Sequence, residues 1–218
     1  MQPLEYLLLS LPVLVLSLTV HEFMHAWVAL KQGDDTAYLQ GRVTLNPVVH
    51  TDPIGTLLLP GIAALTGAPM IWWARPTPVT PRKFRNYRRG DLLVSAAGVA
   101  GNLMLAFAFA LLCVVVVWAG RALPDLGRTW ELLLAMFALG IQLNILLILF
   151  NLLPLPGLDG SHILYHFLPA RIGAHYRALE PYGIIILFGL LFLGGFRWLQ
   201  PAVAAIFGYF GIGISLLT

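Results

Sequence analysis

The sequence predicts an all-α polytopic membrane protein with about five to six hydrophobic segments and short β pieces at the membrane surface. Hydrophobic residues make up 59% of the 218 residues and charged residues only 11%, whereas a typical soluble domain carries about 25% charged residues. The mean hydropathy is +0.82, and several stretches are long and apolar enough to cross a bilayer. A chain with so few charged residues cannot form a protein surface that is well solvated by water. We therefore expect lipid to be the solvent, and the composition excludes a disordered chain.

Six apolar stretches account for the predicted membrane segments. A helix crosses the hydrocarbon core with about 20 predominantly apolar residues. In chain order the stretches are residues 6–32, 53–74, 92–120, 132–158, 181–196 and 198–218. No polar region between them is long enough for a second domain, so we expect residues 1–218 to form a single membrane-embedded domain. The N-terminal MQPLEYLLLS has no basic region, and we do not expect it to be a removable signal peptide.

Two short segments outside the longest apolar runs have the pattern of extended chain. The run QGRVTLNPVV has Val and Thr in alternation, and its Asn46-Pro47 is a turn signal. Residues 73–79 contain two prolines, and a residue that precedes proline avoids the helical region. We expect short strands at about residues 41–48 and 73–79, which could pair with each other at the membrane surface.

The basic residues are concentrated in one loop. Six of the 13 Lys and Arg residues lie between Arg75 and Arg89. Loops rich in Lys and Arg stay on the cytoplasmic side of a membrane. The alternative interpretation is a nucleic-acid surface, but the loop has no interleaved aromatic platform on which bases could stack. We therefore expect a cytoplasmic loop and no nucleic-acid partner.

The first apolar stretch carries a metal-binding pattern, His21-Glu22-Phe23-Met24-His25. Two histidines at i and i+4 lie on one face of a helix and can hold one Zn²⁺. The glutamate beside them is placed to take a proton from an attacking water. The alternative is a pair of structural histidines with an unrelated acid. Three costly polar groups within an apolar helix favour the metal site.

A third ligand is needed, because catalytic zinc is held by three protein side chains and keeps one position open. Asp159 is the best candidate. It follows the uncharged stretch 132–158 in the sequence NLLPLPGLDG, where prolines and glycines break the helix. Irregular backbone is tolerated at membrane depth only where it lines a protein cavity. The alternative is a loop aspartate that caps the next helix.

Together, HEFMH and NLLPLPGLDG resemble the motifs of the site-2 protease family of intramembrane zinc metalloproteases, in its compact bacterial form without PDZ or CBS domains. The segment GRVTLNPVVHTDPIGTLLLP is similar to the linking region of these proteins, so the resemblance covers residues 14–164. It implies one Zn²⁺ per chain on His21, His25 and Asp159, with Glu22 as general base and acid. It also implies that Asn151 helps to hold the substrate or the oxyanion.

The resemblance further implies a function and a location. We expect a zinc metalloendopeptidase that hydrolyses peptide bonds in or near the transmembrane segments of other proteins, in contact with membrane lipid. We expect it in the plasma membrane of a prokaryote, with the active site toward the cytoplasm. Two other classes stay open. A metal-binding membrane transporter needs polar residues that recur along several helices, and a non-cleaving, protease-like scaffold has no need of Glu22.

One segment departs from the family pattern. The sequence AGVAGN at residues 97–102 has valine where the family usually has proline. For this reason we carry no role over to Asn102. Gly98 and Gly101 are interpreted as sites of close helix packing.

Three further histidines and the single cysteine need an interpretation. His162 and His166 form a second i, i+4 pair without a glutamate between them, and we expect them to belong to a cytoplasmic helix rather than to a second metal site. His50 is a candidate for gating the site or replacing a ligand. Cys113 lies in an apolar run and is expected to be a small core residue.

The metal site predicts a membrane topology. Ligands of one ion must lie at one depth, so the first segment and the segment 132–158 should end on the same side. Segments 92–120 and 132–158 form an antiparallel pair, which places Asp159 on the side of the basic loop. Residues 53–74 then begin and end on that side. We expect a re-entrant hairpin there, broken near Pro60-Gly61.

Overall fold

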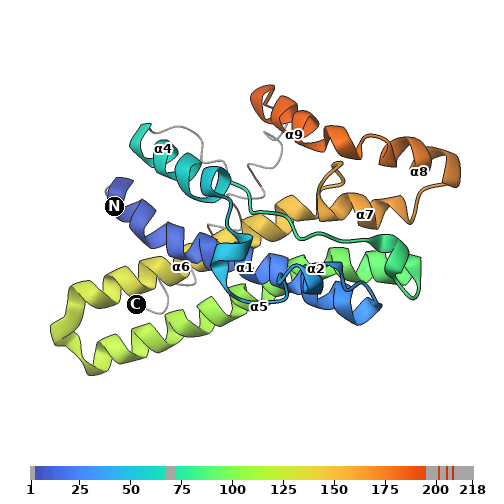
Figure 1. The fold of residues 1–218 in the computed structure, drawn as a ribbon. Coiled ribbons are helices and arrows are strands. Elements are labelled where there is room, and N and C mark those ends of the chain that lie inside the picture. The colour runs from blue at the N-terminus through green and yellow to red at the C-terminus, as the bar shows by residue number, and fades with distance from the viewer. Residues whose placement is uncertain (1–2, 67–71, 195–200, 202–204, 206–207, 209–218) are drawn as a thin grey trace.

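The computed structural model describes residues 3–66 and 72–194, together with residues 201, 205 and 208. Within these residues all regular structure is helical, and three helices are long and apolar enough to cross a membrane (Figure 1). They are α1 (Pro3–Gln32), α5 (Tyr87–Ala122) and α6 (Gly127–Asn151). The prediction of a mostly helical chain is confirmed, and three of the predicted stretches form candidate membrane-spanning helices.

Shorter helices connect and flank these three. They are α2 (Thr36–Leu39), α3 (Pro47–His50), the π-helix η1 (Pro53–Leu58), α4 (Leu59–Thr66), η2 (Pro81–Lys83), η3 (Pro124–Leu126), α7 (Asp159–Tyr165), α8 (Ala170–Arg177), η4 (Glu180–Tyr182) and α9 (Gly183–Phe192). Most of the apolar stretch 198–218 lies outside the described residues. The count of five to six membrane segments therefore stays a prediction.

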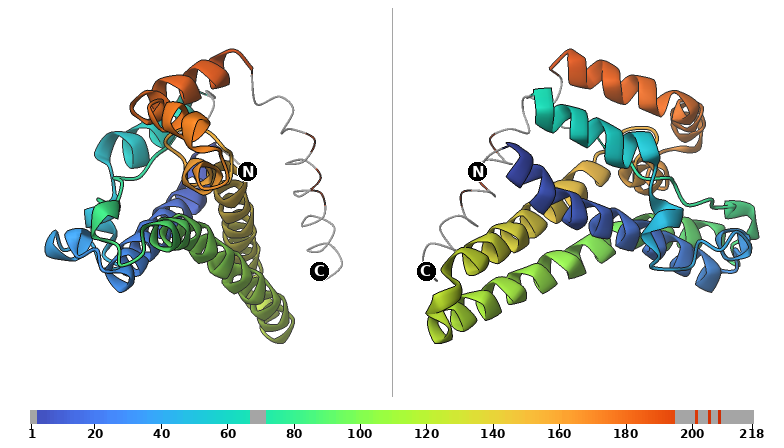
Figure 2. Two further views of the ribbon diagram at one scale, coloured as in Figure 1. Left: turned by 90° about the vertical axis from the view of Figure 1, so that its right-hand side faces the viewer. Right: turned by 60° about the vertical axis from the view of Figure 1, so that its left-hand side comes forward.

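The three long helices form the centre of the fold. Helices α5 and α6 make an antiparallel pair, and α1 packs against both (Figures 1 and 2). Their shared core contains Leu14 of α1, Phe109 and Cys113 of α5, and Leu147 of α6. Gly140 of α6 allows this approach, because an added Cβ would lie 2.6 Å from the Phe109 ring. Cys113 is buried, as predicted for a small core residue.

One face of α5 is apolar and exposed. Phe107, Leu111, Val115 and Trp118 follow one another at spacings of three or four residues, and their side chains are 60–69% exposed. A helix of 36 residues with such a stripe has the length and the surface that a lipid environment requires.

The helix ends lie together as the metal-site argument predicts. At one end, the Arg85 amide donates to the Gln32 carbonyl over 2.9 Å, so α1 ends beside the start of α5. Helix α7 contacts the first turns of α5 there. At the other end, Arg128 of α6 pairs with Glu5 of α1. Asp159 and the basic loop are therefore at one end of the bundle.

The two ends of the segment 53–74 lie next to each other in the fold. The Thr56 hydroxyl donates to the Trp73 carbonyl over 2.7 Å, and the Arg75 amide donates to the His50 carbonyl over 2.9 Å. Gly55 lies against the Trp73 ring, which an added Cβ would enter at 2.3 Å. Both ends of the segment thus meet, as predicted for a hairpin, although residues 67–71 are outside the described part of the chain.

The two predicted strands are wrong. The Asn46 side chain accepts a hydrogen bond from the Val48 amide and Pro47 follows it, so Asn46-Pro47 begins helix α3 rather than ending a strand. Residues 72–80 run as an extended trace in Figure 1 but form no described ladder. The amides of Thr77 and Thr80 donate instead to the carboxylates of Glu22 and Asp34. Side-chain acceptors therefore replace the partner strand.

Candidate metal centre

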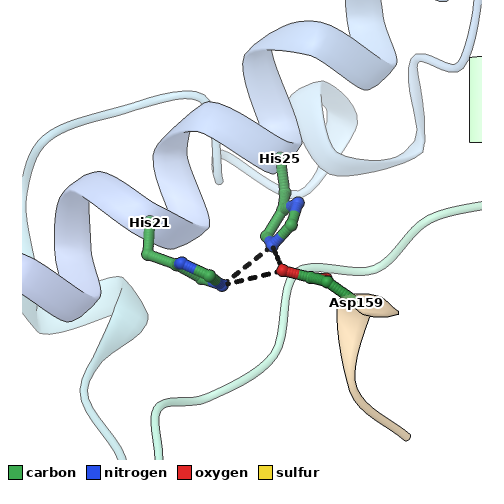
Figure 3. A group of neighbouring side chains, drawn as sticks. All are labelled: His21, His25 and Asp159. Atoms are coloured by element: carbon green, nitrogen blue, oxygen red, sulfur yellow. Dashed lines mark hydrogen bonds and ion pairs between the residues drawn. The ribbon is translucent and has the colours of Figure 1, made fainter. Parts of the chain in front are cut away.

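Helix α1 presents His21 and His25 on one face, and Asp159 of α7 meets them (Figure 3). The Nε2 atoms of the histidines lie 3.0 Å apart. The Asp159 Oδ2 atom lies 3.5 Å from His21 Nε2 and 3.4 Å from His25 Nε2. Both histidines are buried. The structure thus brings together the three ligands that the sequence suggested.

The triangle of donor atoms fits a tetrahedral zinc ion. Bonds of about 2.0–2.1 Å to a tetrahedral ion separate its ligand atoms by about 3.3 Å, close to the three observed distances. Asp159 Oδ2 is buried and makes no hydrogen bond in the described structure. A buried carboxylate oxygen without a donor is costly. Two imidazoles and this carboxylate are therefore a suitable donor set for zinc.

The other nitrogen of each histidine is held by helix α5. His21 Nδ1 donates to the Asn102 side-chain oxygen over 2.7 Å, and His25 Nδ1 donates to the Val94 carbonyl over 2.7 Å. Both acceptors fix the proton on Nδ1 and leave Nε2 with a free lone pair. Outer hydrogen bonds of this kind orient zinc-binding histidines and set their tautomer. Asn102 therefore supports a candidate ligand, a position that the sequence argument did not assign because it stopped at the valine of AGVAGN.

A chain of amides extends this support across the bundle. The Asn102 side chain donates to the Asn144 oxygen over 3.0 Å. Asn144 of α6 in turn donates to the Ser17 hydroxyl and to the Gly140 carbonyl, each over 2.8 Å. Both asparagine side chains are fully buried. Because the Asn102 amide nitrogen faces Asn144, its side-chain oxygen faces His21.

Close contact between α1 and α5 depends on glycine. A Cβ at position 98 would lie 2.5 Å from both His21 Cε1 and His25 Nε2. A Cβ at position 101 would lie 2.8 Å from Met24 Cγ. The interpretation of Gly98 and Gly101 as packing residues is confirmed, and Gly98 packs against the rings of both candidate ligands.

Asp159 is the first residue of α7 and follows the irregular segment 152–158 that separates α7 from α6. Helix α6 ends at Asn151, and Gly157 has a φ of 89°, which favours glycine. Gly160 then packs against the end of α6, because an added Cβ would lie 2.4 Å from the Leu152 carbonyl oxygen.

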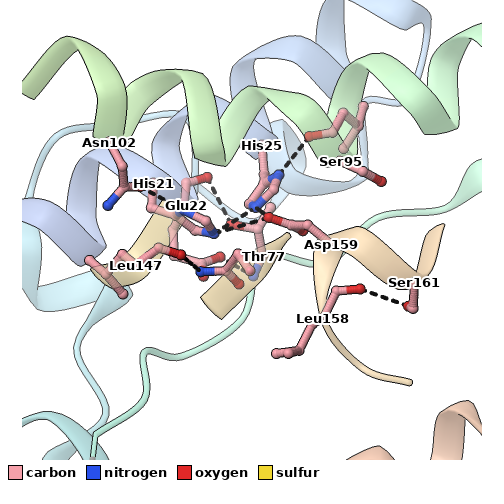
Figure 4. A network of polar contacts seen from close by, with 12 residues as sticks. His21, Glu22, His25, Thr77, Ser95, Asn102, Leu147, Leu158, Asp159 and Ser161 are labelled. Carbon is pink, nitrogen blue, oxygen red and sulfur yellow. Dashed lines mark hydrogen bonds and ion pairs between the residues drawn. The ribbon is translucent and has the colours of Figure 1, made fainter. Parts of the chain in front are cut away.

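Glu22 lies beside the triad and is held by the extended segment 72–80 (Figure 4). The Thr77 amide donates to Glu22 Oε2 over 2.7 Å, and the Thr77 hydroxyl donates to the Glu22 carbonyl over 3.0 Å. One carboxylate oxygen is therefore oriented by the backbone. Thr77 was not singled out from the sequence, since nothing local to residues 73–79 reveals what they cover.

The remaining candidates lie in other positions. Asn151 donates to the Leu147 carbonyl of its own helix over 2.9 Å, and its catalytic role stays a prediction. His50 is buried where the hairpin begins and its Nε2 bonds to the Thr44 carbonyl. Nδ1 of His162 and Nε2 of His166 contact the carboxylate of Asp91 instead of joining the triad.

Comparison with known proteins identifies relatives by sequence. The chain is 44% identical over 185 residues to the protein named "putative zinc metalloprotease YwhC" of Bacillus subtilis, across 84% of this chain and 80% of that protein. It is 29% identical over 225 residues to "putative zinc metalloprotease Rip2" of Mycolicibacterium smegmatis, across 100% of this chain and 81% of that one. Rip2 of Mycobacterium tuberculosis is 32% identical over 202 residues, 61% of its length. No protein-family profile and no solved structure matches the chain.

Proposed function

The chain belongs to the site-2 protease family, and we propose that it is a zinc endopeptidase that hydrolyses peptide bonds in or near the transmembrane segments of other membrane proteins. The observation that carries this proposal is the buried triad of His21, His25 and Asp159 with Glu22 at its side. A metal site alone would suit a transporter or a scaffold. A carboxylate beside it, oriented by a backbone amide, is what proton transfer during hydrolysis requires.

The residues divide the chemistry between them. His21, His25 and Asp159 would hold one zinc ion, which when bound polarises the scissile carbonyl and lowers the pKa of water. Glu22 takes the proton of the attacking water and delivers it to the leaving amine. The Thr77 amide occupies Glu22 Oε2, so the other carboxylate oxygen is the one that exchanges the proton. The buried setting strengthens each of these electrostatic interactions.

The depth of the site supports cleavage near one membrane face. His25 is followed by seven residues before α1 ends at Gln32, which corresponds to about 10 Å along a helix. The basic loop lies at this end of the bundle, and its charge favours the cytoplasmic side. We place the active site near the cytoplasmic surface of a prokaryotic plasma membrane.

Substrates must become extended before cleavage, because the carbonyls of a helix are hydrogen-bonded and shielded. The segment 72–80 is itself extended and passes beside Glu22. An extended segment can bind a second extended chain by strand addition. We propose that this segment holds the unwound substrate, while Asn151 contacts the substrate or the oxyanion.

The proposal is tested by co-expressing the wild type or Glu22→Gln with a panel of single-span membrane proteins. Glu131→Gln serves as the matched control, since Glu131 is exposed at the far end of the bundle. We expect fragments with the wild type and with Glu131→Gln, and about 100-fold less cleavage with Glu22→Gln. Equal cleavage by Glu22→Gln would contradict the role of Glu22 as the base, and absence of any fragment with the wild type would contradict the proposed activity.

A further inference from the structure

We propose that Asp91 is a positioning residue for the metal centre: its carboxylate holds His162 and His166 and thereby fixes helix α7, which carries Asp159. The inference deepens the proposed function, because it rests on Asp159 as a metal ligand. It concerns residues that neither the triad nor proton transfer uses.

The Asp91 carboxylate lies at the meeting point of three helices. It belongs to the second turn of α5, and its side chain is only 4% exposed. Its Oδ2 atom lies 2.8 Å from His166 Nε2 and 3.2 Å from Arg177 of α8, and its Oδ1 atom lies 3.3 Å from His162 Nδ1. A buried carboxylate is tolerated only when donors surround it. Here all the donors come from the chain that follows Asp159.

The spacing along α7 connects this cluster to the metal ligand. Asp159, His162 and His166 stand at i, i+3 and i+7, which is one face of a helix. The start of that face meets His21 and His25 of α1, and the rest of it meets Asp91 of α5. Any rotation or sliding of α7 that broke the Asp91 contacts would also move the Asp159 carboxylate.

Helix α7 cannot hold this position by itself. It has seven residues, and an isolated helix shorter than about 12–15 residues is marginal. At its start, Gly160 rests on the Leu152 carbonyl. At its end, the Asp91 cluster attaches it to α5, together with a hydrogen bond from Arg88 to the His166 carbonyl and a contact between His162 and Glu180. The location of the ligand is therefore set by contacts at both ends of α7 rather than by local helix propensity.

One face of helix α5 therefore supports all three ligands, two by direct contact and the third through α7. Asp91, Val94, Gly98 and Asn102 follow at spacings of three or four residues, which places them along one stripe of the helix. Val94 and Asn102 hold the Nδ1 atoms of the two histidines, and Gly98 packs against both rings. Asp91 extends the same stripe to the third ligand by way of α7.

A second metal site is the rival explanation of the cluster. Among the described residues, the triad is the one group of His, Cys, Asp and Glu whose ligand atoms converge closely enough to hold an ion. The guanidinium of Arg177 also lies against Asp91, and a cation there opposes the binding of a metal ion. The cluster is therefore an ion-pair network.

The test measures zinc binding by the purified full-length protein through competition with a chelator. Asp91→Asn should bind zinc about 10-fold more weakly than the wild type, as changes in the outer shell of metal sites do, and the absorption bands of bound Co²⁺ should shift. Asp35→Asn is the matched control, since it breaks an exposed ion pair with Lys83 at the same end of the bundle. It should bind zinc like the wild type.

A second pair of variants separates positioning from loss of structure. His166→Gln retains an N–H donor near Asp91 and should keep most of the wild-type zinc affinity, whereas His166→Leu should bind zinc as weakly as Asp91→Asn does. Wild-type zinc affinity and an unchanged Co²⁺ spectrum in His166→Leu would overturn the inference, even if Asp91→Asn failed to fold. A wild type that bound zinc but cleaved no substrate would count against the protease and leave this inference standing.

Discussion

Gly98→Ala is a minimal test of how closely α5 must approach the candidate ligands His21 and His25. The added Cβ would lie 2.5 Å from His21 Cε1 and from His25 Nε2, whereas non-bonded carbon contacts are comfortable near 3.5–4.0 Å. The two helices must therefore separate by about 1 Å, or the rings must turn. Neither ring is free to turn, because Asn102 and Val94 bind their Nδ1 atoms.

The size of the effect follows from two opposing terms. Overpacking a tight contact costs about 1–3 kcal/mol, and replacing glycine by alanine within a helix returns about 1 kcal/mol. We expect a net loss of about 1 kcal/mol in the free energy of unfolding. Zinc affinity should fall further, by about 10- to 100-fold, because the displaced groups orient the ligands.

The assay compares Gly98→Ala with Gly189→Ala of α9, where nothing lies within 4 Å of the added Cβ. Thermal unfolding in detergent and chelator competition for zinc are measured for both variants. Gly189→Ala should be as stable as the wild type or more stable, with unchanged zinc affinity. If Gly98→Ala were equally stable and bound zinc equally well, the close contact between Gly98 and the two histidines would be refuted.

Three further predictions concern ligation, pH and topology. Asp159→Ala should lose the expected single zinc ion on dialysis, and retention of zinc by this variant would contradict the ligand set. The Asp91 hydrogen bond raises the pKa of His162 from its ordinary 6.5, so this pair should stabilise the fold fully below pH 6.5 and lose its effect as the pH rises through the raised pKa. The difference in melting temperature between the wild type and His162→Leu should shrink with rising pH, and a constant difference would contradict this. In a background without the native cysteine, a new cysteine at Asp125 should react with an impermeant thiol reagent outside intact cells, whereas cysteines at Asp35 and Asn86 should not.

Much of the site could be predicted from the sequence because its strongest signals are local. The i, i+4 spacing of His21 and His25 determines that they share a helix face, whatever that helix packs against. Placing ionisable side chains within an apolar membrane segment costs free energy, so their presence predicts a function for them. The choice of Asp159 used one more local signal, the helix break of NLLPLPGLDG. The requirement that all three ligands lie at one depth then predicted the hairpin at residues 53–74.

The tertiary structure decided which groups support and cover these ligands. Asn102 is 81 residues from the histidine that it holds, and Thr77 is 55 residues from Glu22. Contacts over such separations depend on how helices pack, and no periodicity in either segment encodes the partner. The same reason explains the failed strands, since residues 73–79 are extended as their prolines indicate but bond to carboxylates of another helix. Hydrophobic spacing determines which helices form and which faces they bury, while the packing of α5 against α1 and α7 determines what meets at those faces.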